Sequence, residues 1–316
     1  MPSRSATVLV AFALALGVTS PGRADEGGVS FWLPGQMASF SAVQGEPGWS
    51  VPLVYYHTSA DASAARNFNI GGNLVAGLDA TANLVFFAPT YTAKQPVLGG
   101  QAAINLVWPA GEMKVRADAI ITGPQGNPIN LSRTDTVSGG GDLYAMGTLK
   151  WAQGKDNWLA YVNAGIPVGA YQVGRLANIG INHWSVDAGG GYTYLDTEKG
   201  REFSGVSGLT YNFENSDTNY KNGIDGHIDL AASQFLSEDL HIGLVGYVYH
   251  QLTGDSGSGA VLGDFKGRVY SIGPQGGYFF PFGSSKGYVN LRGYYEFGAK
   301  NRIEGWNASL TLSLPF

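Results

Sequence analysis

Residues 182–196, NHWSVDAGGGYTYLD, alternate between apolar or small side chains and polar ones. In an extended chain Trp184 and Val186 fall on one face, whereas His183 and Asp187 fall on the other. Such alternation is typical of a β-strand with one apolar and one polar face. The stretch is longer than the usual 5–6 residues of a soluble strand, and it covers the roughly 9–11 residues that a tilted strand needs to cross a membrane.

The same period of two recurs along the chain and ends with residues 303–316, IEGWNASLTLSLPF. The alternation is blurred in the first two segments and regular in the others. We expect about twelve strands, near residues 49–59, 82–93, 97–108, 139–152, 156–167, 182–196, 201–213, 224–236, 239–251, 267–281, 286–298 and 303–316.

The connections between these segments alternate in length. Short ones are predicted at residues 94–96, 153–155, 197–200, 237–238 and 282–285. Longer polar and Gly-rich ones are predicted at residues 60–81, 109–138, 169–180, 214–223 and 252–266, while 299–302 departs from the rule by being short. Short turns on one side and long loops on the other are typical of transmembrane β-barrels.

Composition excludes several classes of protein. Only 14% of the 316 residues are charged, 47 are glycine and none is cysteine. The absence of cysteine excludes disulfides, cysteine-ligated zinc and thiol catalysis. A net charge of −5 argues against nucleic acid as a partner, because phosphate binding needs a basic face.

The first 24 residues have the pattern of a secretory signal peptide. Arg4 is followed by an apolar run over residues 6–18, and Gly22 and Ala24 occupy the −3 and −1 positions of a cleavage site. The run of 13 residues is shorter than the roughly 17–25 that a membrane-spanning helix needs. We therefore expect residues 1–24 to be removed on export.

Residues 25–48 do not have the pattern of a strand. They contain bulky apolar side chains, and Pro34-Gly35 interrupts the run. Leaving these side chains in water would be costly, so we predict a plug inside the barrel, with Phe31 and Trp32 as its anchors. The alternative is a frayed tail in the periplasm.

The combined pattern predicts an all-β fold, an antiparallel up-and-down transmembrane β-barrel of about 12 strands over residues 49–316. Both termini would be periplasmic, and the protein would be a monomer surrounded by outer-membrane lipid. Tryptophan residues at both ends of the predicted strands match two interfacial belts. A soluble sandwich would have shorter strands, and a β-helix would show a short repeat that is missing.

The order of several short motifs is familiar. They are Leu33-Pro34-Gly35, Pro47-Gly48-Trp49, Val97-Leu98-Gly99-Gly100, residues 246–251 (GYVYHQ), residues 254–257 (GDSG), residues 272–275 (IGPQ) and Tyr295-Glu296-Phe297. In this order they resemble the family labelled putative MetA-pathway of phenol degradation, whose relatives include sphingosine-induced outer-membrane proteins. The resemblance spans nearly the whole mature chain.

The resemblance implies a porin-type barrel for passive uptake of small hydrophobic or aromatic compounds, with no enzymatic activity and no cofactor. One alternative is a structural or adhesive barrel without transport, and another is an outer-membrane lipid hydrolase. A hydrolase would need His and Ser together on the lipid face. We expect His250 there, with no Ser beside it on its own strand, while the pattern assigns no face to His57.

Polar alternate positions of a membrane barrel face its lumen. We predict a solute path lined by Tyr247, Tyr249, Gln251, Arg292, Tyr294, Asp187, Asp225, His227 and Asp229. Asp225, His227 and Asp229 share one strand face, but side chains two residues apart lie roughly 6.5–7 Å from each other. This spacing is wide for ligands of a single ion, and we expect no metal site.

Overall fold

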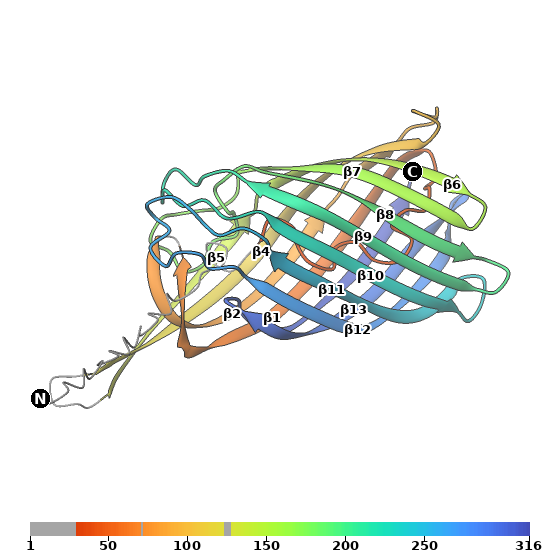
Figure 1. Cartoon of the computed structure of the whole chain (residues 1–316). Coiled ribbons are helices and arrows are strands. Elements are labelled where there is room, and N and C mark those ends of the chain that lie inside the picture. Colours follow the sequence, from red (N-terminus) through yellow and green to blue (C-terminus); the bar gives the residue numbers. More distant parts are fainter. Residues whose placement is uncertain (1–29, 71, 123–127) are drawn as a thin grey trace, which may run out of the picture.

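The computed structural model describes residues 30–70, 72–122 and 128–316, and all its regular elements are β-strands (Figure 1). No helix in this described part of the chain is long and apolar enough to cross a membrane. The strands are β1 (Gly48–Ile70), β2 (Asn73–Phe87), β3 (Thr90–Thr92), β4 (Gln101–Thr122), β5 (Pro128–Gly140), β6 (Leu143–Gln153), β7 (Asp156–Ile166), β8 (Ser185–Asp196), β9 (Arg201–Asn212), β10 (Asp225–Phe235), β11 (Leu240–Gln251), β12 (Arg268–Phe282), β13 (Ser285–Lys300) and β14 (Glu304–Pro315).

These elements form a closed antiparallel barrel of twelve wall strands, which confirms the predicted fold. The last strand, β14, pairs with β1 from Ser50↔Pro315 to Asp61↔Glu304 and completes the ring. Two wall strands are interrupted. β2 and β3 both pair with β4 on either side of Pro89, which has no N–H for the ladder, and β5 and β6 both pair with β4 on either side of Gly141.

The two connections predicted at residues 60–81 and 109–138 were wrongly expected to be polar loops. They are mostly strand, because β1 with β2 and β4 with β5 continue as long paired hairpins. The inner faces of these hairpins carry apolar side chains that pack against two loops from elsewhere in the chain. This cluster contains Ala62, Phe68, Ile70, Leu78, Ala80, Val115, Ala117 and Val137 of the hairpins, with Leu176, Ala177 and Phe265 of the loops.

The short connection expected at residues 94–96 is longer, because β3 ends at Thr92 and β4 begins only at Gln101. The remaining connections keep the predicted alternation of short and long. The short-turn end of the barrel includes residues 154–155, 197–200, 236–239 and 283–284. Gly154 and Gly283 adopt φ of 63° and 61° in these turns, a conformation that a Cβ would strain. The long-loop end carries loops 167–184, 213–224 and 252–267.

The C-terminus lies at the short-turn end, where the Phe316 amide donates to the Trp49 carbonyl (Figure 1). Which side of the membrane this end faces remains a prediction, and the predicted signal peptide lies outside the described residues.

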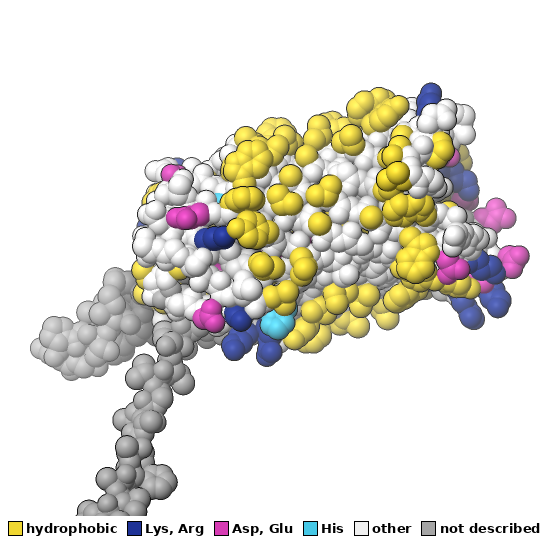
Figure 2. All heavy atoms as spheres, turned by 45° about the horizontal axis from the view of Figure 1, so that its top comes forward, with side chains coloured by type: hydrophobic (Ala, Val, Ile, Leu, Met, Phe, Trp, Pro, Cys, Tyr) yellow, Lys and Arg dark blue, Asp and Glu magenta, His cyan; other side chains and the backbone are white. Residues whose placement is uncertain are grey.

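The outer wall carries an apolar surface. Figure 2 shows hydrophobic side chains spread over the strands, while charged ones gather at both ends of the barrel. Five tryptophans, each about half exposed, mark two levels of this wall. Trp49 and Trp158 lie toward the short-turn end, and Trp108, Trp184 and Trp306 lie toward the other. This outer face has the pattern of a lipid-facing surface with aromatic girdles.

We expect Leu244→Arg to reduce the free energy of folding into vesicles by about 2–4 kcal/mol, because Leu244 is exposed on the outer wall near the middle of β11. The matched control is Leu240→Arg, on the same strand and face but at the membrane edge, which should cost about 0–1 kcal/mol. Urea titrations of refolding would measure both. Equal losses for the two variants would contradict the assigned depth.

Candidate functional site

Residues 30–47 run inside the barrel as an irregular segment, visible as the red trace within the ring of strands (Figure 1). Phe31 and Trp32 are buried, at 4% and 0% exposure. Phe31 packs on Tyr144 of β6, with ring centroids 5.4 Å apart. We call residues 30–47 the inner segment; residues 25–29 of the predicted plug lie outside the described part of the chain.

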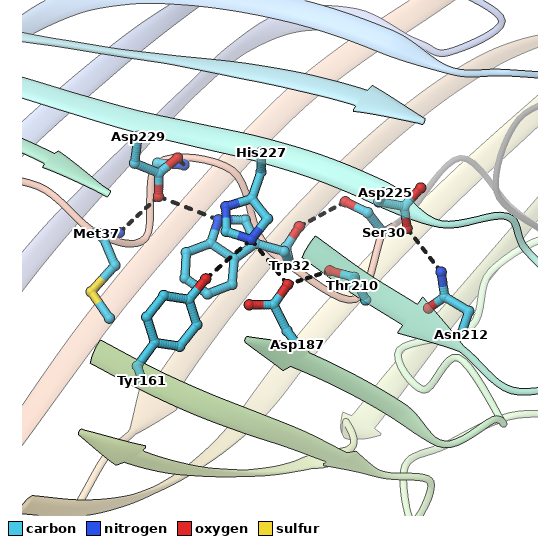
Figure 3. A network of polar contacts seen from close by, with 11 residues as sticks. Ser30, Trp32, Met37, Tyr161, Asp187, Thr210, Asn212, Asp225, His227 and Asp229 are labelled. Atoms are coloured by element: carbon cyan, nitrogen blue, oxygen red, sulfur yellow. Dashed lines mark hydrogen bonds and ion pairs between the residues drawn. The ribbon is translucent and has the colours of Figure 1, made fainter. Parts of the chain in front are cut away.

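Asp229 of β10 holds the inner segment through three hydrogen bonds. Its carboxylate accepts from the Gly35 amide at 2.8 Å, the Met37 amide at 3.1 Å and the Trp32 indole Nε1 at 3.3 Å (Figure 3). Asp229 points inward because the polar residues of β10 occupy alternate positions. A buried carboxylate and buried amides each need partners, so the strand and the segment satisfy one another.

The Gly35 carbonyl is held by residues of β13. Arg292 Nη1 and the Tyr294 hydroxyl donate to the Gly35 carbonyl at 3.2 Å and 3.1 Å. Gly35 has φ of 82°, and an added Cβ would lie 2.8 Å from Tyr294 Cζ. The position therefore requires glycine, both for its backbone conformation and for the close approach of the tyrosine.

Trp32 is stacked against the barrel wall. Its ring lies 3.8 Å from the His227 ring, nearly parallel at 14°, and 5.4 Å from the Tyr161 ring. His227 Nε2 lies 3.0 Å from Asp187 Oδ2, which also accepts from the Thr210 hydroxyl (Figure 3). The predicted residues Asp187 and His227 thus form the platform on which the predicted anchor Trp32 rests.

The second half of the inner segment is attached to strands on several sides of the barrel wall. Glu202 accepts from the Ser39 hydroxyl and the Phe40 amide, and Thr193 accepts from the Ala42 amide. Phe40 lies among the rings of Phe235, His241, Phe279 and Tyr288, with centroids 5.2–6.2 Å away. Toward the short-turn end, Lys150 donates to the Val43 carbonyl at 2.9 Å, and Gln101 exchanges two hydrogen bonds with Gly45.

The remaining predicted path residues also face inward but hold other parts of the structure. Tyr247 packs on Tyr294 and donates to Glu296, and Tyr249 lies under the Arg302 guanidinium. Gln251 donates to Asp255 and accepts from the Gly267 amide, which fastens the loop 252–267, and Asp225 accepts from Asn212. Asp225, His227 and Asp229 therefore have separate partners, and among the described residues no group of three possible ligands is placed to hold a metal ion.

The open space of the lumen lies on the other side of the inner segment. A cavity of about 470 Å³ separates the segment from the walls of β13, β14, β1, β2, β4 and β6. Of the predicted path residues only Arg292 and Tyr294 line it. Its other walls include Val54, Tyr56, Phe86, Val107, Met146, Lys150, Leu159, Asn290, Asn307 and Thr311, none of which was singled out from the sequence as a path residue.

The signal for this cavity was present in the sequence. Residues 51–56, VPLVYY, are apolar on both faces, which blurs their alternation. Leu53 and Tyr55 face outward, whereas Pro52, Val54 and Tyr56 line the cavity. Apolar residues on the inner face of a barrel strand mark a lumen wall that is not fully polar.

Asp142 holds the loop that covers the lumen at the long-loop end of the barrel. Its carboxylate accepts from the Gly169 and Ile181 amides at 2.8 Å and 2.7 Å and holds both ends of loop 167–184. Burial raises the pKa of Asp142 above its usual value, and these two amides act in the opposite direction. With the apolar cluster described above, this loop covers the lumen at that end.

Comparisons with known proteins agree with the architecture. The family model described as "Putative MetA-pathway of phenol degradation" matches residues 63–312. The structure is similar to that of an outer membrane channel from Pseudomonas putida F1, with a TM-score of 0.68 and 17% identity over 90% of this chain and 100% of that one. This likeness confirms the fold, and the apolar outer wall (Figure 2) is that of a barrel that crosses a lipid bilayer.

More distant barrels give weaker matches. A FadL homologue of Pseudomonas aeruginosa aligns with a TM-score of 0.39 and 7% identity, covering 84% of this chain and 88% of its own. The translocator domain of autotransporter NalP from Neisseria meningitidis aligns with 0.40 and 11%, covering 87% and 91%. We draw nothing from these two. No curated protein sequence matches the chain.

We expect Asp229→Asn to loosen the inner segment, because an amide keeps the shape but replaces one acceptor oxygen with a donor facing N–H groups. Loss of a buried hydrogen bond costs about 1–3 kcal/mol, so exchange of the amides over residues 33–42 should speed up tenfold or more. Hydrogen exchange with mass spectrometry would measure it. Asp142→Asn, whose amide partners lie in loop 167–184, is the control; similar acceleration of the inner segment in both variants would show that Asp229 has no particular hold on it.

Proposed function

Since the chain belongs to the family described as "Putative MetA-pathway of phenol degradation", we propose that it is an outer-membrane channel through which small hydrophobic or aromatic compounds pass down their gradient. The family model covers most of the chain, including every wall strand in whole or in part.

The cavity beside the inner segment carries the proposal. It runs from Ser50, Gln101 and Lys150 near the short-turn end to the level of Tyr56 and Asn307 farther inside. Tyr56 and Phe86 form an edge-to-face pair in its wall, with centroids 6.3 Å apart. An apolar solute gains about 25 cal/mol for each Å² that it removes from water, so such a lining favours a hydrophobic or aromatic compound over a sugar.

The inner segment has the contacts expected of a removable obstruction. It adds no strand to the sheet, and its partners are single side chains such as Asp229, Arg292, Glu202 and Lys150. Each hydrogen bond contributes only about 1 kcal/mol net, so the segment can shift without opening the sheet. We infer that its movement widens the path and that lumen width and lining select the solute.

The proposed channel performs no covalent chemistry. A lipid hydrolase would present its nucleophile and base to the bilayer. His183 and Ser185 lie 3.2 Å apart, but both are buried on the lumen side. The geometry gives this alternative no support.

Deleting residues 31–40 removes the bulk of the inner segment, and we expect the ionic conductance of the reconstituted barrel to rise. The double variant Trp32→Ala, Asp229→Ala keeps the chain length and should shift conductance in the same direction by a smaller amount. Planar bilayer recordings would measure both, with folded barrels identified by their faster migration in unheated gels. Unchanged conductance in both variants would refute the plug.

Flux into liposomes tests the solute class. We expect benzoate to enter vesicles containing the barrel faster than xylose, a sugar of comparable size, after subtraction of entry into protein-free vesicles at pH 8. Equal entry of the two would indicate a general pore. Entry of neither, with a folded barrel, would favour a structural or adhesive role.

A further inference from the structure

The cavity beside the inner segment has an uneven charge. Of the described residues that line it, Lys150 and Arg292 are cationic and none is Asp or Glu. The chain as a whole carries a net charge of −5. An acidic protein thus lines its open inner space with positive charge only.

The Arg292 guanidinium has unused binding capacity. The residue is 7% exposed, its Nη1 donates to the Gly35 and Gln36 carbonyls, and its Nε has no hydrogen-bond partner among the described residues. No carboxylate of the described part of the chain lies within 4.0 Å of Arg292 or of Lys150. A buried charge without a counter-charge is costly, and a planar guanidinium is well suited to a carboxylate.

The carboxylates that could neutralise this arginine from inside the barrel have other partners. Asp229 accepts from Gly35, Met37 and Trp32, and Glu202 accepts from Ser39, Phe40 and Ser204. Glu296 accepts from the Tyr247 hydroxyl and the Gly305 amide. The acids of this region hold the inner segment and the wall, and the cations face the open space.

The apolar wall of the cavity favours a ligand whose uncharged part is apolar. Tyr56 lies near Arg292 in the barrel, because Ser309 of β14 pairs with both residues. Val54 and Phe86 continue this wall. The volume of about 470 Å³ lies within the range of about 300–1,000 Å³ that holds small organic ligands.

We propose that this cavity is a binding site for a small organic anion, a monocarboxylate with an aromatic or other apolar body, whose carboxylate is anchored by Arg292. This inference rests on the proposed channel function and narrows its solute class from hydrophobic compounds in general to hydrophobic acids. Lys150, closer to the short-turn end, adds a second positive charge along the same cavity.

The test compares benzoate with its neutral isostere benzamide by calorimetric titration of the purified full-length barrel in detergent. We expect benzoate to bind at least about tenfold more tightly, a preference that Arg292→Met abolishes by weakening benzoate and leaving benzamide unchanged. Tyr294→Phe is the matched control, since it removes a bond to the same Gly35 carbonyl but keeps the cation, and it should retain the preference. Arg268→Met, an exposed arginine of β12, controls for net charge.

Equal binding of the two ligands, absence of saturable binding, or a preference that survives in folded Arg292→Met would overturn the anion site. These outcomes are independent of the flux experiment. If the barrel passes benzoate faster than xylose but shows no charge preference in binding, the channel proposal stands and the anion site is refuted. If the barrel binds benzoate through Arg292 but passes neither solute, the anion site stands and the channel proposal is refuted.

Discussion

In a bilayer each backbone amide must find its partner inside the protein, and the pairing of β1 with β14 meets this requirement for the last open edges. An unpaired edge would leave a row of N–H and C=O groups in hydrocarbon, each costing several kcal/mol. Closure in turn gives every strand one face toward lipid and one toward the lumen. The period of two in the sequence, the outer apolar surface and the inner polar network all follow from this constraint.

The lumen is divided by the inner segment into two halves of different chemistry. On the side of β8–β11, Asp229 and Glu202 accept hydrogen bonds from the segment, and the His227 ring stacks on the Trp32 ring. On the side of β13, β14 and β1–β6 lies the cavity, whose lining is partly apolar and whose charged residues, Lys150 and Arg292, are cationic. Gly35 lies at the boundary, since its N–H donates to Asp229 and its C=O accepts from Arg292, so a change in either contact affects both halves.

Some residues that hold the inner segment in place therefore also line the cavity in which a solute would bind. Arg292 binds two carbonyls of the segment and also lines the cavity, and Lys150 does the same with the Val43 carbonyl. An anion that takes up part of the hydrogen-bonding capacity of these cations competes with the segment for them. In this arrangement the occupant of the cavity and the position of the segment are energetically linked.

The alternation of residues such as those at 182–196 and 303–316 was sufficient to predict the barrel, its strand number and the inward face of every proposed path residue, because the period of two decides which face a side chain occupies. It also pointed to Phe31 and Trp32 as buried anchors, since their apolar surface had to leave water. The long hairpins over residues 60–81 and 109–138 were missed because the apolar cluster that supports them includes Leu176 and Phe265 from distant loops. Only the tertiary structure decided which inward residues meet the segment and which meet open space. Periodicity shows that a side chain faces the lumen, but not whether the inner segment or open space lies opposite it. That depends on where the irregular inner segment finds its hydrogen-bond partners on the barrel wall.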